Sequence, residues 1–141
     1  MNQENKKLLL KDLSARLPYG VKVKVRYCYE YEDGSIKKYN EIKYLDAEIL
    51  DLLIRGDRAL DKIKPYLRQM SSMTEEEENE FKKIFELELK AIESTEGHTI
   101  ESAASSAFAI DFYNKYHFDY RGLIPMGLAI AVTEENNPYK E

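Results

Sequence analysis

The clearest pattern in the chain is an alternation of apolar and polar residues between Val21 and Tyr31. A repeat of two is the side-chain period of a β-strand, so the segment predicts a long strand with two different faces. The predicted core face carries three valines and then three tyrosines: Val21, Val23, Val25, Tyr27, Tyr29 and Tyr31. The opposite face is largely basic and carries Lys22, Lys24, Arg26, Cys28 and Glu30.

The segments after this strand predict a hairpin and two further short elements. Asp33-Gly34 predicts a tight two-residue turn, because both residue types tolerate a positive φ. Residues 35–44 would form the returning strand. Residues 46–56 fit either a short helix, which the spacing favours, or a strand. Residues 63–67 contain Pro65, which predicts an edge strand or a connector.

Three segments have apolar residues at the three- and four-residue spacing of a helix. They cover residues 4–17, 74–94 and 99–116. Thr74 and Glu77 form a capping box that predicts the start of the second helix. Gly97 is expected to end that helix, and Thr99 is expected to cap the third.

These elements predict one α+β domain that covers residues 1–141. Residues 1–68 would form a helix and a small antiparallel sheet, and residues 74–117 would form a two-helix unit. Residues 118–141 would form a tail whose polar end, 134–141, is expected to fray. Whether the tail after Gly122 packs on its own chain or on another stays open.

Composition places the chain among soluble globular proteins. Hydrophobic residues make up 43% of it and charged residues 33%, as in ordinary soluble domains. No apolar run approaches the roughly 20 residues that span a bilayer, and the N-terminus lacks the apolar core of a signal peptide. The single cysteine, Cys28, excludes an intramolecular disulfide and fits a reducing compartment. We therefore expect a cytoplasmic protein with no membrane partner.

One histidine is the first candidate for catalytic or metal-binding chemistry. His117 would act as a base or ligand if Asp119 or Asp111 oriented its ring. A structural metal site needs three or four ligands, and His98 is the only other histidine. The alternative is a histidine at a helix C-terminus, favoured by the helix dipole. Because Cys28 also lacks an activating neighbour and no glycine-rich phosphate loop occurs, we expect no catalytic site, cofactor or metal.

Charge is divided unevenly along the chain, whose net charge is −5. Residues 1–26 contain seven Lys and Arg against two acids, and residues 74–101 contain ten Glu against three Lys. The basic strand face makes Lys22, Lys24 and Arg26 candidates for contact with nucleic-acid phosphates. The sequence pI of about 5.2 argues against this use.

A second candidate surface follows the last predicted helix. His117, Asp119, Tyr120 and Arg121 form an aromatic and charged segment, and Tyr and Arg are enriched at interface hot spots. An alternative stays open, in which Phe118 and Tyr120 close the core and Arg121 pairs with the acidic helix.

Three stretches stand in a characteristic order and spacing along the chain. They read LPYGV at 17–21, IKPYLR at 63–68 followed by MSSMTEEE at 70–77, and NKYHFDYRGLI at 114–124. Together they resemble a family of small uncharacterised proteins from gut bacteria of the Bacteroides type and their prophages. The resemblance extends from near the N-terminus to near the C-terminus and implies a complete chain. It also implies an accessory role in a phage or mobile element.

These observations leave three hypotheses of different classes. The leading one is a non-enzymatic protein that binds another protein through residues 117–121. The second is nucleic-acid binding through the basic strand face. The third is an enzyme that uses His117. The identity of the partner and the oligomeric state stay open.

Overall fold

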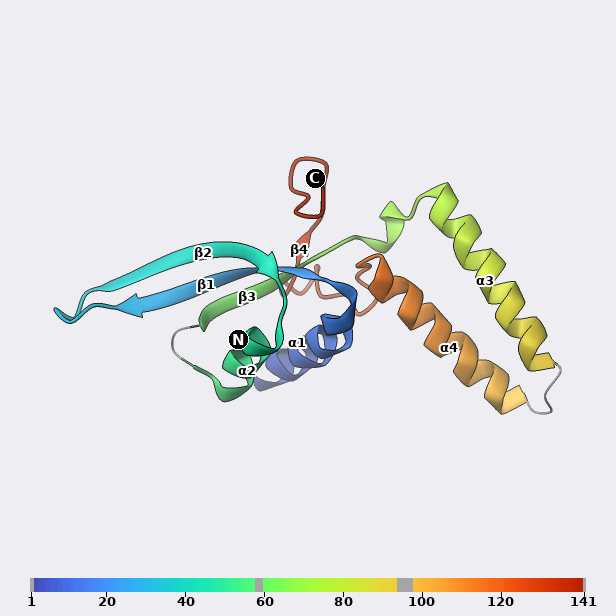
Figure 1. The fold of residues 1–141 in the computed structure, drawn as a ribbon, viewed down its shortest axis with the longest axis horizontal. Coiled ribbons are helices and arrows are strands. Elements are labelled where there is room, and N and C mark those ends of the chain that lie inside the picture. Colours follow the sequence, from blue (N-terminus) through green and yellow to red (C-terminus); the bar gives the residue numbers. More distant parts are fainter. Residues whose placement is uncertain (1, 58–59, 94–97, 141) are drawn as a thin grey trace.

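The computed structural model describes residues 2–57, 60–93 and 98–140 and confirms the predicted α+β class. A mixed four-stranded sheet occupies the centre of the molecule, with two helices packed below it (Figure 1). The β1–β2 hairpin projects from one end of the sheet, and α3 and α4 lie at the other end. The hairpin and the helical pair therefore offer separate surfaces.

Helix α1, Gln3–Arg16, begins at a side-chain cap. The Asn2 carboxamide accepts a hydrogen bond from the Asn5 N–H at 2.7 Å, which satisfies one of the free amides of the first turn. Leu9 and Leu13, one turn apart, are buried in the core. The helix continues into the short 3-10 turn η1, Leu17–Tyr19, and the left-handed Gly20 (φ 70°) then directs the chain into the sheet.

The strand order of the sheet is β2-β1-β3-β4. β1 pairs antiparallel with both β2 and β3, and β3 pairs parallel with β4. The bounds of the strands are Lys22–Glu30 for β1, Ile36–Tyr44 for β2, Leu60–Leu67 for β3 and Ile130–Ala131 for β4. A register shift between Arg26 and Tyr27 marks a bulge in the pairing of β1 with β3.

The loop of the hairpin is one residue longer than the predicted two-residue turn. Tyr31 N–H donates to the Ser35 carbonyl at 2.8 Å, so Glu32 to Gly34 form a three-residue loop. Only Gly34 has a positive φ, at 87°, whereas a two-residue type I′ turn needs two such residues. Asp33 contributes through its carboxylate, which accepts from the Ser35 N–H at 2.9 Å.

Residues 46–56, for which the sequence allowed either a helix or a strand, form helix α2 with bounds Ala47–Arg55. The Asp46 carboxylate accepts from the Ile49 N–H at 2.9 Å and caps its start. Gly56 ends the helix in the left-handed conformation. One face of α2 joins α1 against the sheet, and the resulting core contains the buried residues Leu9, Leu13, Val21, Val23, Val25, Ile49, Leu50, Leu53 and Ile63.

The prediction for the segment around Pro65 was wrong in part. β3 is an inner strand, because β1 lies on one side of it and β4 on the other. β4 pairs only with Tyr66 and Leu67, after the proline. The missing donor of Pro65 therefore falls outside the stretch of β3 that pairs with β4, which lets the strand accept a proline.

The predicted core face of β1 is buried along only half its length. Val21, Val23 and Val25 are fully buried, but Tyr29 is 56% exposed and Tyr31 is 45% exposed. All belong to one face of the strand, as the alternation predicts. Helices α1 and α2 cover the base of the hairpin, and its far half extends beyond them (Figure 1). The two tyrosines are therefore surface residues.

The C-terminal helices pair as expected. α3 spans Glu75–Glu93 and α4 spans His98–Lys115. The capping box is confirmed: Thr74 N–H donates to Glu77 Oε1 at 2.9 Å, and Glu77 N–H donates to Thr74 Oγ1 at 3.1 Å. Residue 94 and Gly97 lie outside the described residues. α4 begins at His98, one residue before the predicted cap Thr99. None of the described helices is long and apolar enough to cross a membrane.

The polar end of the tail is docked on its own chain, contrary to the predicted fraying. The Tyr139 hydroxyl donates to the Tyr66 carbonyl at 2.7 Å and accepts from the Lys22 N–H at 2.9 Å. The Lys22 ammonium donates to the Pro138 carbonyl at 2.8 Å. An aromatic residue two places from the end of the sequence thus fixes a segment whose other residues are polar.

Candidate functional site

His117, the candidate base, lies in a turn directly after α4. It has a left-handed backbone (φ 64°), and its ring stacks on Tyr139 with a centroid distance of 4.1 Å. Burial, with smaller contributions from the nearby cations Arg16 and Arg68, lowers the pKa of His117 to about 4. Its Nδ1 is buried and has no hydrogen-bond partner among the described residues. This environment keeps the imidazole neutral.

The carboxylates expected to orient His117 are engaged elsewhere. Both oxygens of Asp119 accept backbone hydrogen bonds, from the Leu123 N–H at 2.8 Å and the Ile124 N–H at 2.9 Å. Asp111 accepts from the Tyr19 hydroxyl at 2.8 Å. The structure therefore does not assemble the base and carboxylate pair. The described residues contain no group of three or more His, Cys, Asp or Glu that could hold a metal ion.

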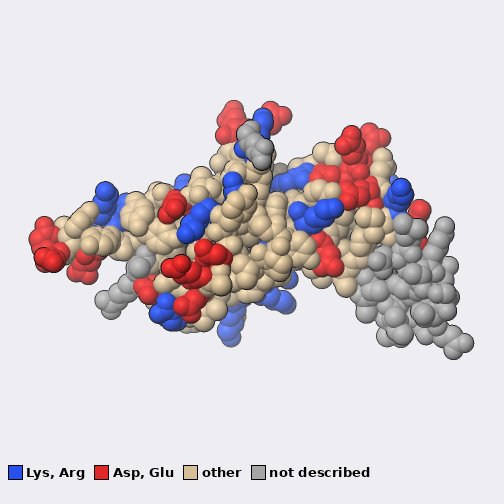
Figure 2. All heavy atoms as spheres, viewed as in Figure 1, with Lys and Arg blue, Asp and Glu red and all other residues tan. Residues whose placement is uncertain are grey.

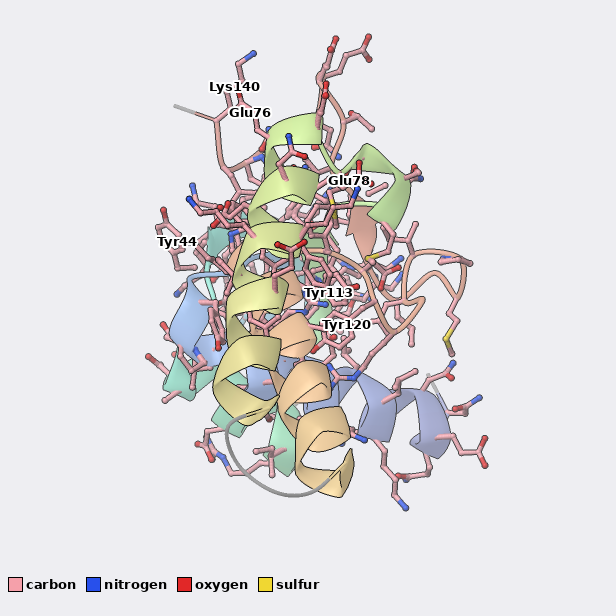
Figure 3. All side chains as sticks on the ribbon, turned by 90° about the vertical axis from the view of Figure 1, so that its right-hand side faces the viewer. Tyr44, Glu76, Glu78, Tyr113, Tyr120 and Lys140 are labelled. Atoms are coloured by element: carbon pink, nitrogen blue, oxygen red, sulfur yellow. The ribbon has the colours of Figure 1, made fainter. Side chains whose placement is uncertain are left out.

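Tyr120 and Arg121, the other candidates of the segment, face the interior of the chain. The Tyr120 hydroxyl donates to Asn114 Oδ1 at 2.9 Å, and its ring stacks near Tyr113 beside α4 (Figure 3). Arg121 donates to Asp12 Oδ1 on α1 at 2.9 Å. The open alternative is confirmed for Phe118, which is fully buried. It was wrong for Arg121, because Arg68 makes the pair with the acidic helix, with Glu77 at 2.6 Å.

Two buried charges on α1 explain why residues 117–121 turn inward. Asp12 and Arg16 are both 0% exposed and form an ion pair at 2.8 Å. Arg16 also donates to the Phe118 carbonyl at 2.7 Å, so α1 holds the segment both at Phe118 and at Arg121. Sequence reasoning missed this network, since the helical spacing of Asp12 and Arg16 is also typical of an exposed pair. The structure brings the segment together as a junction between α1 and α4.

The basic face of β1 is confirmed as a face and enlarged by β3. In the register of the sheet, Lys64 lies beside Lys24 and Lys62 lies beside Arg26. These four cations, with Asn40 of β2 and Ile130 of β4, line a shallow hollow of about 270 Å³. Sequence reasoning missed Lys62 and Lys64, although their spacing of two is a strand signal. Their place beside β1 follows only from the pairing.

The cations of this face differ in how far they are neutralised. Arg26 pairs with Asp61 at 2.6 Å, and this hydrogen bond lowers the pKa of the Asp61 carboxyl. Lys22 is held by the tail, and its ammonium lies 4.8 Å from the Tyr44 ring centroid. No ion pair with a described residue is formed by Lys24, Lys62 or Lys64. Three of the cations around the hollow are therefore available to an anion.

The hairpin also carries most of the exposed large apolar side chains. Of ten such residues in the described part of the chain, six lie between residues 22 and 44: Tyr29, Tyr31, Ile36, Tyr39, Ile42 and Tyr44. Tyr27 and Tyr39 pack across the two strands with ring centroids 5.4 Å apart. The loop end of the hairpin is acidic, with Glu30, Glu32 and Asp33, and appears red at the far end in Figure 2. We call these three residues the acidic tip.

Comparison with known proteins identifies no relative of this chain. No family model, curated protein or solved structure matches the chain.

Proposed function

We propose that the chain is a non-enzymatic protein-interaction module and that the β1–β2 hairpin, residues 22–44, is its contact element. One observation carries the proposal: six of the ten exposed large apolar residues in the described chain lie on this hairpin. Exposed apolar side chains with polar neighbours mark protein-binding surfaces, because burial of apolar surface against a partner lowers the free energy of the system. Tyrosine is also enriched among the residues that dominate binding energy.

The hairpin replaces residues 117–121 as the proposed contact surface. Tyr120 and Arg121 donate hydrogen bonds to Asn114 and Asp12 of their own chain. Tyr29 and Ile36, in contrast, are 56% and 61% exposed. The resemblance to proteins of gut bacteria and prophages adds the proposal that the partner is met in a phage or mobile-element setting.

Site-specific photocrosslinking in the producing cell tests this proposal. A photoreactive amino acid replaces Ile36 on the hairpin or, as a matched control, Ile54 on α2; both isoleucines are 61% exposed. The proposal predicts a discrete adduct from position 36 that is absent from position 54. It also predicts loss of this adduct in an Ile42→Ser variant, which is changed on the same face of the hairpin as Ile36 and retains its circular dichroism spectrum. Equal crosslinking from the two positions would contradict the proposal.

A second candidate function, binding of a nucleic-acid strand to the basic face, is favoured by the addition of Lys62 and Lys64 to Lys24. Neutralised phosphates release counterions, so the affinity should fall steeply with salt. Labelled single- and double-stranded oligonucleotides at low and physiological salt test it, with a Lys22→Ala, Lys24→Ala, Arg26→Ala variant as the comparison. Absence of binding at low salt would remove this candidate.

A further inference from the structure

The outer face of the hairpin, which points away from α1 and α2, changes charge along its length. At its base, around the hollow, lie Lys24, Lys62 and Lys64, which form no ion pair within the described part of the chain. At its far end lies the acidic tip, in which Glu30 and Glu32 form no ion pair with a described residue. The two ends of one face therefore have opposite charge, about one strand length apart.

Apolar side chains accompany both ends of this face. Ile42 lies beside Lys24 in the register, and Ile36 lies beside Glu30. Ile42 is 51% exposed and Ile36 is 61% exposed. Each end thus combines an exposed isoleucine with charge of one sign, and the two ends match except that the sign is reversed.

A face of this kind is complementary to itself when it is turned end over end. We infer that the outer face of the hairpin packs against the same face of a second copy, with the β1 strands antiparallel. This inference rests on the proposed function and names its partner. A twofold axis across the strands, level with Tyr27, brings Lys24 opposite Glu30 of the second copy. The same axis brings Ile42 opposite Ile36 of the second copy, because both lie on β2 at the same rows.

The hollow gives the acidic tip of the second copy a specific place. Lys62 and Lys64 extend the basic base sideways onto β3, where Lys64 lies in the row of Lys24 and Lys62 lies in the row of Arg26. Glu30 of the second copy lies opposite the row of Lys24 and Lys64, and Glu32 lies beyond it, opposite the row of Lys22. All the contacts occur twice, as an isologous interface requires.

The size of the face sets the expected affinity. Nine-residue strands are roughly 30 Å long, and three neighbouring strands are about 10 Å across. The resulting face is small compared with the roughly 800 Å² per partner of standard stable interfaces. We therefore expect a reversible dimer with a dissociation constant on the order of 10–100 μM, which weakens as salt screens its charges.

Charge along the face favours a second copy over a nucleic-acid strand. A strand that tracks the hairpin from the hollow outward would meet Glu30, Glu32 and Asp33, which repel phosphates. Two cations lie between the base and the tip, Arg26 and Lys38, and both are already paired with Asp61, at 2.6 and 3.6 Å. A second copy fits both ends of the face, because its own lysines lie opposite the acidic tip and its own acidic tip lies opposite the lysines.

A charge-swap experiment tests the inference. One variant carries Lys24→Glu and Lys64→Glu, and the other carries Glu30→Lys and Glu32→Lys. Each variant alone would place like charges opposite each other and should dimerise at least roughly tenfold more weakly than the unmodified protein. An equimolar mixture restores opposite charges at both ends, so sedimentation velocity should show a heterodimer. A Lys7→Glu, Lys11→Glu variant, altered at exposed positions of α1, should dimerise like the unmodified protein.

The outcomes separate the inference from the proposed function. A monomeric unmodified protein up to about 1 mM at low salt, or a mixture no more associated than either variant, would overturn the inference. If the protein stays monomeric while position 36 still crosslinks to a different protein, the proposed function stands and the second copy is excluded. Oligonucleotide binding to the monomer that is lost in the Lys24→Glu, Lys64→Glu variant would assign the face to nucleic acid instead.

Discussion

Removal of the Asp12 carboxylate should destabilise the fold more than any comparable change at the surface. Asp12 is fully buried and accepts from Arg16 at 2.8 Å and from Arg121 at 2.9 Å. Asp12→Ala would leave Arg16, also 0% exposed, as a buried charge without a counterion. Breaking such a pair costs about 3–5 kcal/mol. For a chain of this size the midpoint of thermal unfolding should fall by roughly 10 °C or more.

The chain contains a matched control for this prediction. Asp51 and Arg55 form the same type of aspartate–arginine pair on α2, at 2.9 Å, but both side chains are 58% exposed. Asp51→Ala should cost less than about 1 kcal/mol. Urea unfolding followed by circular dichroism measures both variants, provided that the m-value is unchanged. If the two variants differ by less than about 1 kcal/mol, the buried network does not hold residues 117–121 against α1.

Three further predictions concern groups whose environments the structure defines. Hydrogen bonds from Arg68 lower the pKa of Glu77 to about 2. Unfolding measurements should therefore show that the free energy of unfolding falls as the pH drops from about 4.5 to 2, and that this fall is smaller in Glu77→Gln. Burial lowers the pKa of His117 from 6.5 to about 4, so the unfolded chain binds a proton at a higher pH than the folded chain does. The free energy of unfolding should therefore fall by on the order of 2 kcal/mol as the pH drops from 6.5 to 4. His117→Phe should abolish this dependence. Tyr139→Phe removes the hydrogen-bond acceptor of the Lys22 N–H and should lower the free energy of unfolding by about 1–3 kcal/mol. It should also speed hydrogen exchange at that amide, and an unchanged exchange rate would contradict the docked tail.

The sequence predicted the elements of this fold well where a local signal exists. Alternation located β1, and Thr74 with Glu77 located the start of α3, because both signals act over a few residues. Which part of a face is covered depends on elements elsewhere in the chain. The burial of Val25 and the exposure of Tyr29 are determined by where α1 and α2 end, and no local pattern contains this information.

The candidate sites show the same division. Lys24 and Arg26 were found from alternation, but their neighbours Lys62 and Lys64 required the pairing of β1 with β3. Residues 117–121 have the composition of an exposed hot spot. Their inward contacts depend on Asp12, more than 100 positions earlier in the chain. Composition alone does not distinguish a binding surface from an internal junction of this kind.

Crosslinking of the single cysteine tests the self-association of the hairpin most directly. Cys28 is half-buried on the outer face, near the proposed twofold axis. Sheets packed about 10 Å apart, with an offset of two residues, would place the two Cys28 Cα atoms roughly 12 Å apart. A short bis-maleimide should give a covalent dimer of twice the 16.5 kDa chain mass at low salt, and much less of it in the Lys24→Glu, Lys64→Glu variant. Equal yields from the two proteins, or no dimer from either, would contradict the account.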